Sequence, residues 1–201
     1  MTESASFVDW GIARTVASAV GRGEPADAWA SNPERAREIC DEALERVLAY
    51  TRLEPAAPIP AAELVGRTEW IESNVAGMRE LAAPLEERAT GELSLPWPVG
   101  GIVRGALGAA AGAEAGVVIG YAARRVLGQY QVALTPEPSE APRMLLIGSS
   151  LTHTADELRA GHAGFLQWVA IHEQTHSVQF ASVPWLREHL AGLIARLIAS
   201  A

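Results

Sequence analysis

Two histidines and a glutamate stand close together in the stretch WVAIHEQTHSVQF, residues 168–180. On an α-helix, side chains four residues apart lie on the same face, one turn from each other. His172 and His176 can therefore direct their imidazoles at one point, as two ligands of a zinc ion must. Glu173 lies about 100° further round the helix. It is therefore placed beside the open position of such a metal, where a carboxylate can act as general base. The spacing matches the HExxH motif of zinc hydrolases.

The residues around the motif favour this interpretation. They are uncharged and none is proline, so nothing competes for the metal or breaks the helix. All five histidines of the chain lie after residue 150. A strand-like segment, 143–148, precedes the motif, and zincin peptidases place an edge strand above the motif helix. The alternative is a helix with two solvated histidines and an incidental glutamate. His153 and His162 lie outside the motif, and loop or capping roles are expected for them.

Composition sets limits on location and partners. The chain has 201 residues and a net charge of −8, which disfavours nucleic acid and anionic membrane surfaces as partners. Cys40 is the single cysteine, so no internal disulfide forms. The N-terminal MTESASFVDW lacks the layout of a signal peptide. A cytoplasmic location is expected.

The remaining pattern is mostly helical and predicts a mainly α fold with a small β hairpin or sheet. Asn32 and Pro33 are typical of a helix start, and a Pro-rich connector follows at 54–63. Two short segments have strand character and are separated by the turn-rich PEPSEAP, so they are expected to pair. The predicted strands are 129–135 and 143–149. Helices are predicted at 33–50, 61–88 and 165–180. A short helix is also expected to start at a capping box formed by Thr154 and Glu157, and a last helix to start at Pro184. We expect a helical region, 1–90, and a motif region, 91–201, in one integrated domain.

A glycine-rich helix between residues 101 and 130 permits two interpretations. Gly108, Gly112, Gly116 and Gly120 recur every four residues and would let another backbone approach one side of the helix. In an apolar segment this spacing also occurs in membrane helices. The segment contains four charged residues, so no charge-free run of about 20 residues remains. These charges are Arg104, Glu114, Arg124 and Arg125. We therefore expect a central helix of a protein without membrane spans, with Glu114 facing solvent.

Several segments resemble an actinobacterial family of zinc-dependent hydrolases with a zincin-like fold. They are RRVLGQYQVAL, the strand at MLLIG, the WVAIHEQTHSVQF helix, the VPWLREHL that follows it, and the N-terminal VDWGIARTVA. The resemblance covers nearly the whole chain, and one branch of the family is associated with biosynthesis of a deazaflavin coenzyme. It implies that His172 and His176 bind zinc and that Glu173 is the catalytic base.

The third zinc ligand is the weakest part of this interpretation. Metzincins carry a histidine where this chain has Ser182, which excludes that class. Later in the chain, His189 is better aimed than Glu188 and is the candidate third ligand. Members of the family continue beyond this length, however, so we expect the third ligand in a C-terminal part and the domain to be incomplete here. The apolar stripe of the last helix would then favour self-association; it comprises Leu193, Ile194, Leu197 and Ile198.

Two functions follow from the sequence. The first is a zinc-dependent metallohydrolase, peptidase-like, in which a zinc-activated water attacks a peptide or small-molecule substrate and Glu173 acts as the general base. The alternative is a truncated or degenerate relative that keeps the helical scaffold and serves as a non-catalytic binding module.

Overall fold

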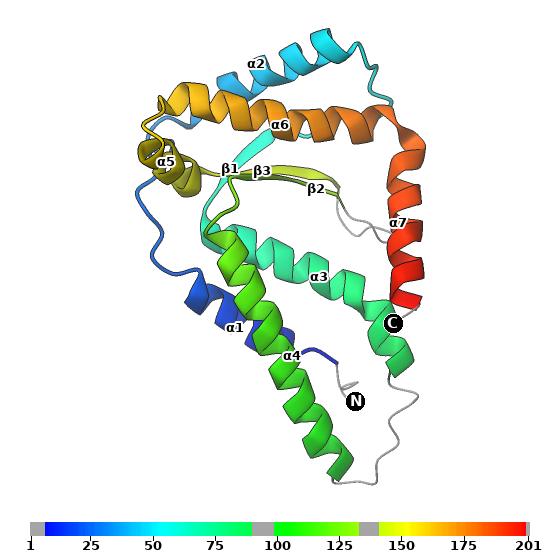
Figure 1. Ribbon diagram of the computed structural model, residues 1–201. Helices are drawn as coiled ribbons and strands as arrows, with labels where there is room; N and C mark the ends of the chain where they lie inside the picture. The colour runs from blue at the N-terminus through cyan, green and yellow to red at the C-terminus, as the bar shows by residue number, and fades with distance from the viewer. Residues whose placement is uncertain (1–6, 90–98, 133–140, 200–201) are drawn as a thin grey trace.

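The strand β3 (Arg143–Ile147) is the centre of the fold in the computed structural model, which describes residues 7–89, 99–132 and 141–199. Met144, Leu145, Leu146 and Ile147 are all fully buried. Successive side chains of a strand point to opposite faces, so a continuous apolar run needs a layer on each side. Figure 1 shows these layers, with helices above and below a three-stranded sheet.

The sheet has the order β1-β3-β2. The strand β2 (Gly128–Gln131) pairs antiparallel with β3, with Tyr130 opposite Met144. The expected hairpin strands therefore pair, although residues 133–140 between them lie outside the described part of the chain. The strand β1 (Ala62–Val65) pairs parallel with β3 on its other side. The fold is thus mainly α with one small sheet, as predicted.

The two faces of the sheet carry separate cores. Met144 and Leu146 pack against α2 (Pro33–Thr51) and α6 (His162–Ser182). Leu145 and Ile147 pack against residues of three other helices. These helices are α1 (Trp10–Val20), α3 (Arg67–Ala89) and α4 (Val99–Ala123). Segments from both the 1–90 and the 91–201 regions contribute to each core, because β1 pairs with β3 and α2 packs on α6.

Two short-range predictions about helix boundaries were wrong. The predicted helix 61–88 begins with β1, and α3 starts only at Arg67. Ala62, Glu63 and Leu64 are good helix formers, but pairing with β3 some 80 residues away outweighs that local preference. The Thr154/Glu157 capping box does not start a helix, because α5 (Gly148–Glu157) begins directly after β3. The N-cap of α5 is Ile147, which has no side-chain cap; Ser149 Oγ in the first turn donates a hydrogen bond to Glu24.

The other boundaries lie close to those expected. Asn32 accepts a hydrogen bond from the Arg35 amide at the start of α2, as its position predicted. The helix α6 is longer than the predicted 165–180, with Gly161 at its N-cap and Gly164 inside it. The last helix, α7 (Pro184–Ala199), turns sharply from the end of α6 (Figure 1).

The glycine-rich helix is confirmed as a close-packing helix, but it is not central. A Cβ built on Gly112, Gly116 or Gly120 would lie 2.3, 2.5 or 2.6 Å from a backbone oxygen of the Asp9–Ala17 segment. Side chains at these positions would force α1 and α4 apart. Only 22% of the apolar window Gly101–Ala123 is buried, however, and by length and composition this helix could cross a membrane. Glu114 is exposed, as expected.

Candidate metal centre

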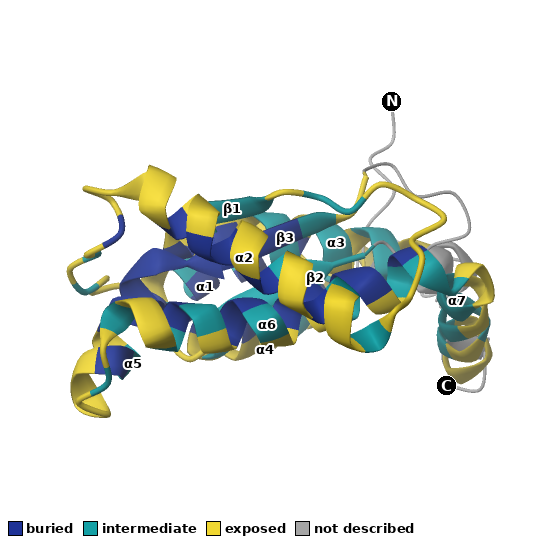
Figure 2. Cartoon of the chain, turned by 90° about the horizontal axis from the view of Figure 1, so that it is seen from above, coloured by how far each residue is buried: buried dark blue, intermediate teal, exposed yellow. Residues whose placement is uncertain are grey.

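The helix α6 separates the motif residues onto two faces. Val169, Ala170, Ser177 and Val178 are buried on the side that faces α2 and the sheet. His172 is exposed and His176 is half-buried on the outer side. Figure 2 shows the resulting alternation of buried and exposed residues along the helix. The two imidazole centroids lie 5.0 Å apart and the ring planes are nearly perpendicular. The structure therefore brings the two predicted ligands together, one turn apart.

Glu173 is on the buried side, with 7% of its surface exposed. Its Oε2 accepts a hydrogen bond of 2.9 Å from the backbone amide of Tyr130 in β2. Gly128, two residues earlier in the same strand, leaves space for the carboxylate. A Cβ there would meet Glu173 Cγ at 2.9 Å. The Tyr130 amide and the space at Gly128 thus hold the Glu173 carboxylate in one place, next in sequence to His172.

The edge strand beside the motif helix is β2, which corrects one prediction. Segment 143–148 was expected to supply the edge strand above the motif helix, but β3 lies in the middle of the sheet with partners on both sides. The strand β2 forms the edge, and its Tyr130 ring packs 5.5 Å from Phe180 of α6. Gly128 and Tyr130 are thus site residues that sequence reasoning missed. A glycine inside the strand-like GQYQ was the available signal, since it often marks a close approach.

The described residues do not bring a third ligand to the histidine pair. Within residues 7–89, 99–132 and 141–199, no group of three His, Cys, Asp or Glu side chains could hold a metal ion. His189 on α7 instead packs against Trp185, with 5.8 Å between ring centroids. His153 pairs with Glu157 at 3.4 Å, and His162 pairs with Asp156 at 2.8 Å. The assignment of His189 as a metal ligand stays a prediction.

A family comparison identifies the kind of protein. The model of the zincin-like metallopeptidase family matches residues 8–201. The chain belongs to this family. The chain is also similar in fold to a crystal structure of an inferred hydrolase with a novel fold from Chloroflexus aurantiacus, with a TM-score of 0.73 and 23% identity. That similarity covers 96% of this chain and 59% of the other one. The comparison with curated proteins gave no match.

The imidazole pair suits the metal that the family name implies. Zinc takes neutral histidine nitrogens readily, and two histidines four apart on a helix are a recurrent part of its sites. In this zincin-like chain the pair lies on the open side of α6, where an ion could reach it. The described residues therefore fit two ligand positions of a zinc ion.

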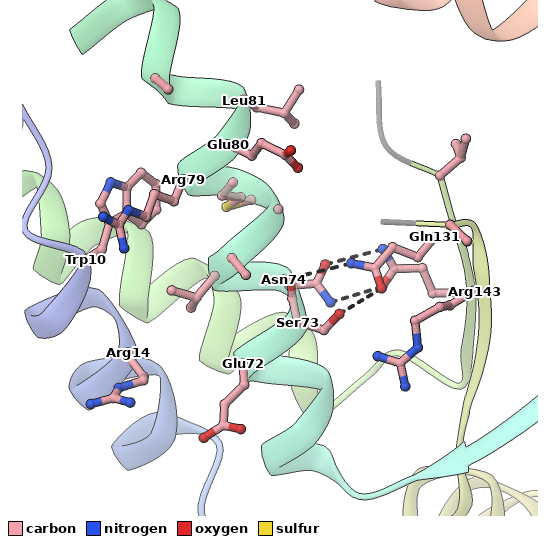
Figure 3. A pocket seen from close by; sticks show the side chains of 18 of the residues that line it. Trp10, Arg14, Glu72, Ser73, Asn74, Arg79, Glu80, Leu81, Gln131 and Arg143 are labelled. Atoms are coloured by element: carbon pink, nitrogen blue, oxygen red, sulfur yellow. Dashed lines mark hydrogen bonds between the residues drawn. The ribbon is translucent and has the colours of Figure 1, made fainter. Parts of the chain in front are cut away.

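A hollow in the described part of the zincin-like chain lies on the opposite face of the sheet. It has a volume of about 940 Å³ and lies along α3, with Gln129, Gln131 and Arg143 of the sheet in its wall (Figure 3). Gln129 and Gln131 alternate in β2 with Gly128 and Tyr130, which contact the motif helix. Asn74 and Ser73 of α3 bind the two glutamine side chains, at 3.1 and 2.8 Å. This hollow is therefore separate from the metal centre.

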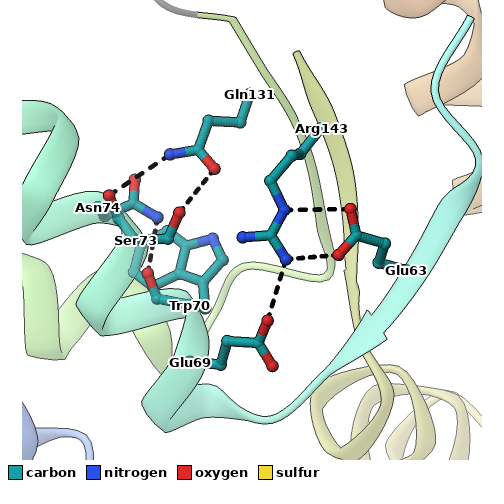
Figure 4. A network of polar contacts seen from close by, with 7 residues as sticks. All are labelled: Glu63, Glu69, Trp70, Ser73, Asn74, Gln131 and Arg143. Carbon is teal, nitrogen blue, oxygen red and sulfur yellow. Dashed lines mark hydrogen bonds and ion pairs between the residues drawn. The ribbon is translucent and has the colours of Figure 1, made fainter. Parts of the chain in front are cut away.

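An ion-pair network lies on the same face of the sheet as this hollow. Arg143 donates to both carboxylate oxygens of Glu63 in β1 and to Glu69 of α3 (Figure 4). The hydrogen bond from Arg143 lowers the pKa of Glu63, and the two carboxylates raise the pKa of Arg143. The network ties β1 to β3 and to the start of α3, and thereby holds the sheet on which the motif helix rests.

Proposed function

We propose that this chain carries the catalytic helix of a zinc-dependent peptide hydrolase. His172 and His176 would bind the ion, and Glu173 would act as the general base. The observation that supports this most is the separation of roles on α6. The two imidazoles project from its open face, whereas the carboxylate is buried and fixed to the Tyr130 amide at 2.9 Å. Burial of a carboxylate is costly unless it is hydrogen-bonded, and the Tyr130 amide supplies that bond here.

Each residue has a distinct task in this proposal. A bound zinc ion lowers the pKa of a coordinated water and polarises a substrate carbonyl. Glu173 takes a proton from the attacking water and transfers it to the leaving amine. The Tyr130 amide and the space at Gly128 keep that carboxylate in one orientation. A peptide is the expected substrate, because the family whose model matches this chain is one of metallopeptidases.

The alternative function is a binding module without catalysis. The observation in its favour is that the described residues supply two imidazoles and no third ligand beside them. Two protein ligands alone hold zinc less tightly than three, because each further ligand is positioned in advance by the fold.

Metal analysis and substitutions of His172 and Glu173 separate the two functions. The purified protein is expected to contain about one zinc ion per chain, which His172→Ala removes and His153→Ala, a matched exposed histidine on α5, retains. Glu173→Gln should keep the zinc and lose hydrolysis of a fluorogenic peptide library, whereas Glu188→Gln keeps both. A parent protein without zinc supports the binding module. Loss of metal in Glu173→Gln would make Glu173 a ligand and exclude the assigned roles.

A further inference from the structure

The inner face of α4 is fixed by its contact with α1. Gly112, Gly116 and Gly120 lie on this face, where backbone atoms of the two helices approach so closely that no side chain fits. Gly108 O also accepts a hydrogen bond of 2.9 Å from the Asp9 amide. The helix therefore cannot rotate, and its opposite face must point away from α1 (Figure 1).

That outer face is apolar and exposed. Val117, Val118 and Tyr121 are 50%, 62% and 56% exposed, and Leu107 continues the apolar surface at 53%. In the described part of the chain, no other helix or strand covers these side chains. Contiguous exposed apolar surface of this kind marks a binding face more often than a solvated one.

Two charged residues, Glu114 and Arg125, lie on this outer face, one on each side of Val118 and Tyr121. Glu114, Val118, Tyr121 and Arg125 are spaced four, three and four residues apart, so they form one stripe along the helix. Arg125 follows the end of α4, but its guanidinium lies over the Tyr121 ring at 3.6 Å and so stays in the stripe. Both charged residues are exposed, and neither forms an ion pair within the described residues. We call these four residues the α4 stripe.

We propose that the α4 stripe binds the α4 stripe of a second copy of this chain, with the two helices antiparallel. In that arrangement Glu114 of each copy lies opposite Arg125 of the other, and Val118 lies opposite Tyr121. The charges select this register, since a parallel pair would place the two Glu114 side chains together. An ion pair then lies at each end of an apolar centre. The stripe is about 16 Å long, because each residue of a helix adds about 1.5 Å along the axis.

The same residues argue against a bilayer as the occupant. Glu114 lies within the apolar face, and an ionised carboxylate in a hydrocarbon layer is costly. A second copy supplies a cation for it. The overlap of two half-helices is small, at the low end of the range for specific interfaces. The dimer is therefore weak, with a Kd on the order of tens of micromolar.

Sedimentation equilibrium of the full chain over about 5–500 µM tests the proposal. The parent is expected to dimerise, and Glu114→Arg or Arg125→Glu should each weaken the dimer at least about tenfold. Each substitution acts twice in a symmetric dimer and replaces attraction by repulsion. The double variant Glu114→Arg/Arg125→Glu should restore the Kd to within about threefold, because the pairs form again with reversed sign.

A matched variant and a check of folding keep the result specific. Glu45→Arg makes the same charge change at an exposed site of α2 and should leave the dimer unchanged. Circular dichroism melts check that each variant is folded. A parent that is monomeric at the highest concentration, or a double variant as weak as the single ones, would overturn the proposal. So would a dimer that is lost in Leu197→Glu of α7 and kept in Glu114→Arg, or a monomer that floats with phosphatidylglycerol vesicles.

Discussion

The helices α4 and α6 lie on opposite faces of the same sheet and contact it in opposite ways. The helix α6 buries side chains, among them Leu166, Val169 and Val178, and leaves its histidines outside. The helix α4 buries glycines against α1 and leaves valines and Tyr121 outside. In α6 the apolar face is therefore the inner face, whereas in α4 most of the large apolar side chains are on the outer one. The comparison teaches that backbone contact, where it is available, can decide which face of a helix is buried.

The largest effect on stability is expected in α4, where packing depends on backbone contact with α1. In Gly116→Ala the new Cβ would lie 2.5 Å from the Ala13 carbonyl oxygen, which cannot move without its helix. We expect a loss of about 2–4 kcal/mol in the free energy of unfolding, measured by urea titration. Gly105→Ala is the matched control in the same helix, because nothing lies within 4 Å of its Cβ position. It should gain about 0.5–1 kcal/mol from helix propensity. Equal effects at the two sites would remove the close α1–α4 contact.

A smaller effect is expected on the α6 side, where the neighbours are side chains. In Gly128→Ala the new Cβ would meet Glu173 Cγ and Leu146 Cδ2, each at 2.9 Å, and both can shift. We expect a loss of about 1–2 kcal/mol in urea unfolding. Zinc content should stay the same while peptide hydrolysis falls, because the displaced carboxylate is the proposed base and not a ligand. Gly164→Ala, with open space at its Cβ, should change neither quantity. If Gly128→Ala hydrolyses peptide at the parent rate, the Glu173 position does not depend on β2.

The smallest effect on stability is expected for the ion pair of Arg143 and Glu63, which ties β3 to β1. Because Arg143 lowers the pKa of folded Glu63, this stabilisation is complete above the pKa of the unfolded glutamate, about 4.3. It is lost as the pH falls through the lower folded value. The side chain of Glu63 is 42% exposed, so the contribution stays below about 1 kcal/mol.

Unfolding of Glu63→Gln and the parent at two pH values measures this contribution. The difference in the free energy of unfolding should be present at pH 7 and vanish near pH 2. Glu45→Gln, at an exposed site of α2, should show no such dependence. A difference that grows towards low pH would mean that the network stabilises the protonated carboxyl group.

Local patterns in the sequence were sufficient for several elements. The apolar run in RMLLI, the Asn32–Pro33 start of α2 and the glycine spacing of α4 each act over a few residues, and each appears in the structure as expected. The spacing of His172 and His176 likewise follows from helix geometry alone, which places the two rings 5.0 Å apart.

Contacts distant in sequence decided the rest. AELV is a strand because β3 accepts it as a parallel neighbour, and no local signal predicts that partner. The burial of Glu173 depends on the Tyr130 amide and on the space at Gly128, both supplied by a strand more than 40 residues earlier. The exposed face of α4 follows from the position of α1. Residue type and spacing thus determined which side chains could bind a metal, because a helix fixes neighbours within one turn. Only tertiary packing decided which of these side chains is buried and which strand holds it, since burial depends on surfaces contributed by the whole chain.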